Sequence, residues 1–408
     1  MVSVTGGRSI KGDLLSRSAE PVAPSRRIDG IDVLRGLALL GVLTINTVFE
    51  FRVSIFEQFL PPVGAESPVD SVLQRFLEIA VELKAFALFS LLFGVGLAIQ
   101  FDRLGADRGR LVLLVRRLLI LLVIGVAHLF LLWNGDILVE YAVAGLVVLP
   151  FLFGPRWLVL AVASAALLLY IAMPLLPPIV SFPSNVWMRA HVAEARQIYG
   201  SGDFLDVFMF RNREISALLP LHLLVFPRTI GLFLCGVLAW RTGIFLRPGN
   251  HGRLLFSLAA GSLIVGAGLA LAAQEPEMFG WPPLGRLQEP ADRLGGLMLA
   301  CAYAATVIAC VRLPGGQTKL AWAAPIGRMA FTNYLAQSFI LGWIFYGYGL
   351  GLFGRLSVTM AFAVGVALYV AQVAFSTWWL SRYRYGPVEW LWRTLMYSAW
   401  QPMIVRGP

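Results

Sequence analysis

Long apolar runs, rather than amphipathic stripes, dominate this chain. Ten runs reach or approach the roughly 20 apolar residues that a helix needs to cross a bilayer. Helices are expected because lipid offers backbone amides no partner, and the runs lack the alternation of barrel strands. The pattern predicts an all-α polytopic membrane bundle with spans at Ile31–Phe51, Phe76–Phe101, Leu118–Trp133, Ile137–Phe153, Trp157–Val180, Ile215–Trp240, Leu254–Ala273, Leu294–Val311, Met329–Tyr348 and Leu356–Leu380.

Three of these runs are irregular. The third and fourth are short, so their hairpin is expected to lie tilted or buried within the bundle. The sixth contains His222, Pro227 and Arg228. A proline removes a backbone hydrogen bond, and a mid-span arginine needs a partner or water. Two alternatives follow: a broken helix lining a cavity, or a span that begins at Thr229 with Arg228 reaching outward.

Composition agrees with the membrane assignment, and the charge distribution predicts the orientation. Of the residues, 58% are hydrophobic and 14% charged, against about 25% charged in soluble domains. With ten helices and a cytoplasmic N-terminus, 22 of the 33 Lys and Arg residues fall on the inside, as the positive-inside rule requires. The net charge of +10 therefore reflects the membrane orientation of the chain and does not indicate nucleic-acid binding. Both ends are predicted to be cytoplasmic.

This topology divides the chain into three parts. Residues 1–27 are a polar tail that is expected to be disordered, without a signal peptide. Residues 28–380 form the bundle, with longer outer loops at 181–214 and 274–292. Residues 381–408 form a cytoplasmic segment in which tryptophans indicate an interfacial aromatic belt.

The clearest candidate chemistry lies in HLFLLWNGDILVEYA. His128 lies in the outer half of its span, and Asn134-Gly135 supplies a tight turn before Asp136 and Glu140. A hairpin here brings Asp136 or Glu140 to His128, orienting the imidazole and raising its basicity. The alternative is a histidine that only makes structural hydrogen bonds.

Other ionisable or polar residues inside spans are functional candidates because each is costly in hydrocarbon. Asp32 and Arg35 can pair at i, i+3. No paired cysteines or HExxH motif is present, so no metal site is expected. The candidates for substrate or coenzyme contact are Asp32, Arg35, Asn46, Glu82, Lys84, Arg228, Asn333 and Gln337. Gly94 and Gly96 are expected to permit close helix packing.

Five segments together resemble the YeiB-like family of bacterial membrane proteins of unknown function. They are RIDGIDVLRGLALLGVLTIN (27–46), LFSLLFGVGLA (88–98), GVAHLFLLWNGDILVEYAVAGL (125–146), GRMAFTNYLAQS (327–338) and YGPVEWLWRTLMYSAWQPM (385–403). The last contains the C-terminal motif with Glu389 and Arg393. The resemblance implies a multi-pass protein of the bacterial plasma membrane.

That family is in turn distantly similar to membrane acyltransferases, including heparan-α-glucosaminide N-acetyltransferase and polysaccharide O-acetylases. The shared feature is the R-x-D-x-x-RG opening, here Arg27, Asp29, Asp32, Arg35 and Gly36. The resemblance implies an acyl group moved from cytoplasmic acyl-CoA, a co-substrate rather than a tightly bound cofactor, to an envelope glycan or lipid. The chain departs from the pattern in its histidines, because Asn46 stands where O-acetylases place one.

Three alternatives therefore remain, the third being a sensor or a structural partner in an envelope complex. In the first, an acyltransferase, His128 is the base and Arg35 with its basic neighbours holds the coenzyme phosphates. In the second, a permease, exporter or lipid-handling protein, intramembrane His, Glu and Arg residues form a path without covalent chemistry.

Overall fold

The structure, a computed structural model, describes residues 29–61, 67–104, 109–178, 180–245, 251–275, 277 and 284–404. Within them the chain is helical, and the only β pairing is an isolated bridge between Tyr383 and Ile404. Eight described helical segments are long and apolar enough to cross a membrane. The predicted all-α membrane bundle is therefore confirmed, whereas the count of ten spans and their orientation stay predictions. The predicted tail 1–27 lies outside the described residues.

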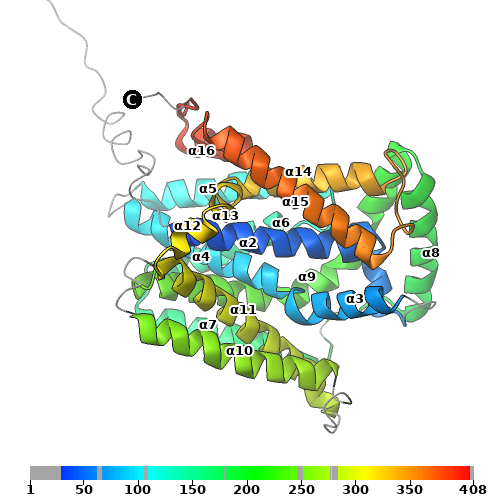
Figure 1. Ribbon diagram of the computed structural model, residues 1–408, viewed down its shortest axis with the longest axis horizontal. Coiled ribbons are helices and arrows are strands. Elements are labelled where there is room, and N and C mark those ends of the chain that lie inside the picture. The colour runs from blue at the N-terminus through cyan, green and yellow to red at the C-terminus, as the bar shows by residue number, and fades with distance from the viewer. Residues whose placement is uncertain are drawn as a thin grey trace, which may run out of the picture.

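The helices follow one another closely along the chain (Figure 1). They are α2 (Asp29–Ile45), α3 (Pro68–Ala80), α4 (Lys84–Arg103), α5 (Arg110–Leu131), α6 (Leu138–Val148), α7 (Arg156–Ala172), α8 (Asn185–Ser201), α9 (Phe204–Arg241), α10 (Gly252–Gln274), α11 (Gln288–Arg312), α12 (Gly316–Leu320), α13 (Ala323–Arg328), α14 (Ala330–Phe345), α15 (Val358–Leu380) and α16 (Pro387–Tyr397). Short 3-10 segments are η3 (Ile55–Phe59), η4 (Leu149–Leu152), η5 (Met173–Leu175) and η8 (Gly285–Leu287), and η2 (Asn46–Phe51) is a π-helix.

Helix α2 is the centre of the bundle, and with η2 it forms the most deeply buried of the eight candidate spans (Figure 1). Small residues let its backbone approach α13. A Cβ on Gly36 would lie 2.1 Å from the carbonyl oxygen of Ala323, and one on Gly327 would lie 1.9 Å from that of Asp32. Membrane helices associate through such contacts because lipid tails remove the hydrophobic drive between them.

The crossing of α4 and α9 depends on two further glycines. A Cβ on Gly94 would lie 2.0 Å from the carbonyl oxygen of Phe233, and one on Gly236 would lie 2.1 Å from that of Leu91. The expectation that Gly94 permits close packing is thus correct. Gly96 does not share this role, because its Cβ would meet only the Arg117 guanidinium, at 3.9 Å.

Neither of the two alternatives for the sixth span is found. Helix α9 runs without interruption from Phe204 to Arg241, with Pro220 and Pro227 inside it. Arg228 does not reach outward either, because it is only 5% exposed. The run predicted as Phe76–Phe101 is instead divided at residues 81–83, where Leu83 has a positive φ of 60°.

Two predicted spans form helices shorter than a membrane crossing. The run Ile137–Phe153 forms the 11-residue α6 and then η4, because Pro150 has no amide to continue the α-helix. The run Met329–Tyr348 forms the 16-residue α14. The predicted outer loop 181–214 is largely helical, and α8 lies across the ends of neighbouring helices (Figure 1).

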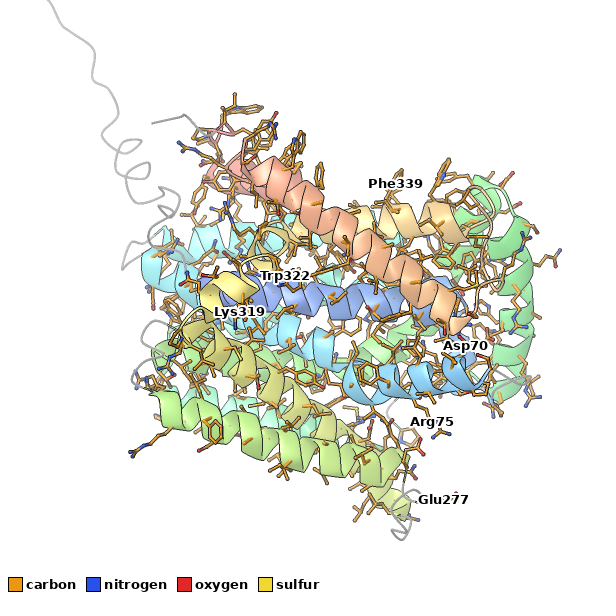
Figure 2. The ribbon with its side chains drawn as sticks, in the orientation of Figure 1. Asp70, Arg75, Glu277, Lys319, Trp322 and Phe339 are labelled. Carbon is orange, nitrogen blue, oxygen red and sulfur yellow. The ribbon has the colours of Figure 1, made fainter. Side chains whose placement is uncertain are left out.

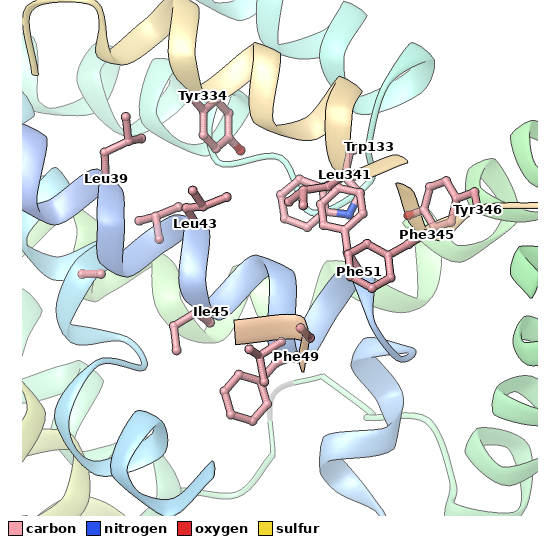
Figure 3. Close-up of a cluster of buried hydrophobic side chains, with 14 of the residues drawn as sticks. Leu39, Leu43, Ile45, Phe49, Phe51, Trp133, Tyr334, Leu341, Phe345 and Tyr346 are labelled. Carbon is pink, nitrogen blue, oxygen red and sulfur yellow. The ribbon is translucent and has the colours of Figure 1, made fainter. Parts of the chain in front are cut away.

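Charged side chains lie at both ends of the bundle. Figure 2 places Lys319 and Trp322 towards one end, and Asp70, Arg75 and Glu277 towards the other. Between these ends lies a core that gathers α2, η2, α5, α14 and α15. Figure 3 shows its aromatic part, where Phe51 stacks on Trp133 with ring centroids 4.8 Å apart.

Candidate functional site

Three buried side chains from three elements form a continuous chain of hydrogen bonds. His128, on the last turn of α5, has its Nδ1 atom 2.8 Å from Asp136 Oδ1. Its Nε2 atom is 2.9 Å from Ser338 Oγ on α14. Each of the three residues is 2% exposed. We call this set the Asp136–His128–Ser338 chain.

The geometry defines the tautomer of His128. A carboxylate only accepts hydrogen bonds, so Nδ1 must carry the proton that Asp136 receives. The Nε2 lone pair of the neutral ring then faces the Ser338 hydroxyl. This is the arrangement in which an imidazole removes a proton from a serine nucleophile.

A tight turn between α5 and α6 positions Asp136. Gly135 is needed there because a Cβ would lie 2.3 Å from the Trp133 ring and 2.8 Å from Glu50 Oε2. The second oxygen of Asp136 accepts the Val139 amide at 2.7 Å, so the same carboxylate caps the start of α6. One residue therefore both starts a helix and orients the histidine.

Helix α14 carries Ser338, and its neighbours attach the helix to α15. Asn333 Nδ2 donates to Ser376 Oγ at 2.9 Å, and Gln337 Nε2 donates to Gln372 Oε1 at 2.8 Å. These two predicted contact residues thus make interhelical hydrogen bonds.

The C-terminal motif caps α14. Glu389 accepts the backbone amides of Phe331 and Thr332 at 2.8 and 3.1 Å, and also the Thr332 hydroxyl. Gly386 must be glycine, because its Cβ would lie 2.2 Å from a Glu389 carboxylate oxygen. The motif thereby fixes the helix that carries Ser338.

Two residues of the site, Ser338 and Glu50, are not among the candidate residues that the sequence predicts. Glu50 lies in the π-helix η2, against Gly135, and its charge acts on Tyr334. The Tyr334 ring lies 5.2 Å from that of His128. A π-helical segment is frequent at functional sites, but no sequence signal reveals it.

A second buried network supports the turn from outside. Glu214 accepts Asn134 Nδ2 at 2.9 Å, His191 Nε2 at 2.7 Å and the Tyr199 hydroxyl. Burial, together with the charge of Glu214, holds the pKa of Tyr199 well above its ordinary value, so that hydroxyl keeps its proton and donates. Arg211 donates to the carbonyls of Phe130, Leu131 and Leu132 at the end of α5.

Glu140 does not reach His128. Its carboxylate instead binds His222 Nδ1 at 3.2 Å and the Thr229 hydroxyl on α9. Next to Thr229, Arg228 lies over the Tyr170 ring at 5.7 Å, and its Nε and Nη1 atoms have no hydrogen-bond partner. Lys84 donates to the Glu78 carbonyl at 2.9 Å.

Arginines gather at the other end of the same helices. Arg35 pairs with Asp32 at 2.9 Å, as predicted. Arg117 on α5 is buried, hydrogen-bonded to Gln100 and 4.7 Å from the Trp392 ring. The charges of Arg35 and Arg393 both act on it. This set, which we call the arginine cluster, could bind an anion such as a phosphate.

Among the residues that the structure describes, no group of three or more His, Cys, Asp or Glu side chains is arranged to hold a metal ion.

Similarity to known proteins covers nearly the whole chain. The family described as "Protein of unknown function (DUF418)" matches residues 239–399. The uncharacterized protein YxaH of Bacillus subtilis (strain 168) is 32% identical, over 95% of this chain and 98% of its own. The uncharacterized protein YeiB of Escherichia coli (strain K12) is 31% identical, over 92% and 97%. An uncharacterized 39.9 kDa protein of Bacillus acidopullulyticus is 28% identical, over 95% and 99%.

Proposed function

We propose that this chain, which belongs to the YeiB-like family of membrane proteins of unknown function, is a membrane acyltransferase of the bacterial plasma membrane. It would move an acyl group from cytoplasmic acyl-CoA to a glycan or lipid acceptor of the envelope. The observation that carries the proposal is the Asp136–His128–Ser338 chain, with bonds of 2.8 and 2.9 Å.

The first step acylates Ser338. His128 Nε2 takes the proton from Ser338 Oγ as that oxygen attacks the thioester carbonyl, and Asp136 stabilises the resulting imidazolium. The carbon–sulfur bond breaks, and the proton passes from His128 to the departing thiolate. The products are an acyl-serine ester and free coenzyme A. A nucleophile from the acceptor then attacks the ester carbonyl while His128 takes its proton. The bond to Ser338 Oγ breaks, and His128 passes that proton to Ser338.

The arginine cluster supports the coenzyme end of the proposal. Guanidinium groups suit phosphates because their planar donors bind two oxygens at once. Helix α2 joins the two ends, since Arg35 and Asn46 are separated by about 17 Å at 1.5 Å per residue. The coenzyme would bind its phosphates at the cluster and extend its thioester arm along α2 towards Ser338.

The test is acylation without an acceptor. Purified protein in detergent is incubated with radiolabelled acetyl-CoA, quenched in acid and assayed for protein-bound label. We expect label on the wild type, none on Ser338→Ala and little on His128→Ala. Ser90→Ala is the matched control, because Ser90 is also buried and bonded to Tyr141 at 2.9 Å, away from the chain.

A permease or exporter is the second candidate, and Arg228 favours it. An arginine inside a membrane span costs about 2.5–3.5 kcal/mol on insertion scales, and this one is buried without a partner for two of its nitrogens. A helix broken at Pro227 would have favoured a transport site, but α9 is continuous and gives no such support. If no label or acetyl-CoA binding appears but reconstituted vesicles show substrate counterflow, the acyltransferase proposal is wrong.

A further inference from the structure

Glu50 presents an unpartnered carboxylate to the Asp136–His128–Ser338 chain. It is half-buried, and its Oε2 atom lies 2.8 Å from the position a Cβ on Gly135 would take, next to Asp136. No hydrogen bond or ion pair to it occurs among the described residues, although its charge acts on Tyr334 and Tyr346. A carboxylate enclosed by protein normally has a hydrogen-bonded or charged partner.

A second carboxylate shares this environment. Glu82 lies in the break between α3 and α4, is half-buried, and is close enough for its charge to act on Glu50. Lys84 is two residues away and its charge also acts on Glu82, although its amine donates to the Glu78 carbonyl and forms no ion pair with Glu82. Two carboxyl groups are therefore close together, and neither forms an ion pair in the described part of the chain.

Asn46 adds an independent unpartnered acceptor. It is 3% exposed, and its Oδ1 atom has no hydrogen-bond partner. Asn46 begins η2 and Glu50 follows four residues later in the same π-helix, so both lie on one side of it. All three groups are acceptors, and a ligand that satisfies them must supply several N–H or O–H donors.

We propose that Glu50, with Glu82 and Asn46, forms the acceptor subsite and that the acceptor presents a primary amine. An ammonium group supplies three donors and the positive charge that two carboxylates favour, whereas a hydroxyl supplies one donor and no charge. This inference rests on the proposed function for the reaction but not for the binding of the amine.

In the second half-reaction, Glu50 is the proton acceptor. Glu50 takes one proton from the bound ammonium, which leaves a neutral amine. The amine nitrogen attacks the carbonyl of the Ser338 ester, the carbon–nitrogen bond forms, and the bond to Ser338 Oγ breaks. His128 transfers the second amine proton to Ser338 Oγ. The products are an amide, free serine and a proton on Glu50 that leaves to water.

The experiment separates the two half-reactions. Protein labelled from acetyl-CoA is freed of coenzyme, and loss of label is followed with propylamine or with propanol, which differ only in the nucleophilic group. We expect Glu50→Gln to acquire label as the wild type does, to lose it at least tenfold more slowly with propylamine, and to be unchanged with propanol. Glu50→Asp should recover part of the amine rate. Glu289→Gln, an exposed carboxylate paired with Arg293, is the control.

A binding measurement distinguishes the remaining outcomes. Propylamine should raise the melting temperature of the wild type but not of Glu50→Gln or Glu82→Gln. If this stabilisation occurs and no label ever forms, the amine subsite stands and the acyltransferase proposal fails. If label forms and Glu50→Gln discharges to propylamine at the wild-type rate, the subsite assignment is wrong and the acyltransferase proposal stands.

Discussion

Asp136→Asn gives the sharpest test of the Asp136–His128–Ser338 chain, because the structure predicts how the new amide will point. The Val139 amide donates to Asp136 Oδ2 at 2.7 Å, and leaving this buried donor unsatisfied would cost about 1–3 kcal/mol. The asparagine oxygen will therefore stay on Val139, and its NH₂ group will face His128 Nδ1.

This orientation reverses the tautomer of His128. Nδ1 must then accept, so the ring proton moves to Nε2 and points at Ser338, whose proton the ring can no longer take. The same exchange in serine-protease triads lowers kcat about 10⁴-fold, which is about 5.4 kcal/mol at 1.36 kcal/mol per tenfold. We expect a similar loss in the rate of Ser338 acylation, and a melting temperature within a few degrees of the wild type because the cap on α6 is kept.

The assay is the rate of protein-bound label from acetyl-CoA, with thermal unfolding measured on the same preparation. Asp203→Asn is the matched control, since Asp203 caps α9 by accepting the Leu205 and Asp206 amides away from the chain. A rate for Asp136→Asn within tenfold of the wild type would show that His128 does not need this tautomer, and the reasoning would fail.

Three further predictions concern residues that support the site through helix capping, helix packing and hydrogen bonding. Glu389→Ala should lower the free energy of unfolding by about 3–5 kcal/mol, because two backbone amides and a hydroxyl lose their acceptor; an unchanged melting temperature would contradict this. Gly94→Ala should destabilise by about 1–3 kcal/mol through its contact with Phe233, whereas Gly96→Ala should be neutral or stabilising in the same melting assay. Glu214→Gln should slow Ser338 acylation by about tenfold or more, because it would loosen the turn at Asn134. Equal acylation rates for the variant and the wild type would show that this turn does not depend on Glu214.

The sequence predicted the membrane class and part of the site, because both depend on local patterns. Apolar runs define helices through composition alone. Likewise, Asn134-Gly135 predicted the turn that brings Asp136 to His128, eight residues apart. Residue spacing alone could not decide whether Asp136 or Glu140 contacts His128, because that depends on which carboxylate the turn directs towards the histidine.

The remaining site residues come together only through tertiary packing. Ser338 is separated from His128 by 210 residues, and nothing in the local sequence marks it among the polar residues of α14. Glu50 depends on a π-helical turn that exposes it towards Gly135. The sequence left open whether α9 is continuous, because a proline removes a backbone hydrogen bond, while neighbouring helices in a bundle can compensate for the lost bond.

The contact between Glu389 and α14 has a consequence for biosynthesis. Thr332 precedes Glu389 by 57 residues, so at 5–20 residues per second its amide is synthesised about 3–11 s before its acceptor. During that interval the serine-bearing helix has uncapped amides and no fixed position. A chain truncated before Glu389 would therefore lack the group that caps the helix carrying Ser338.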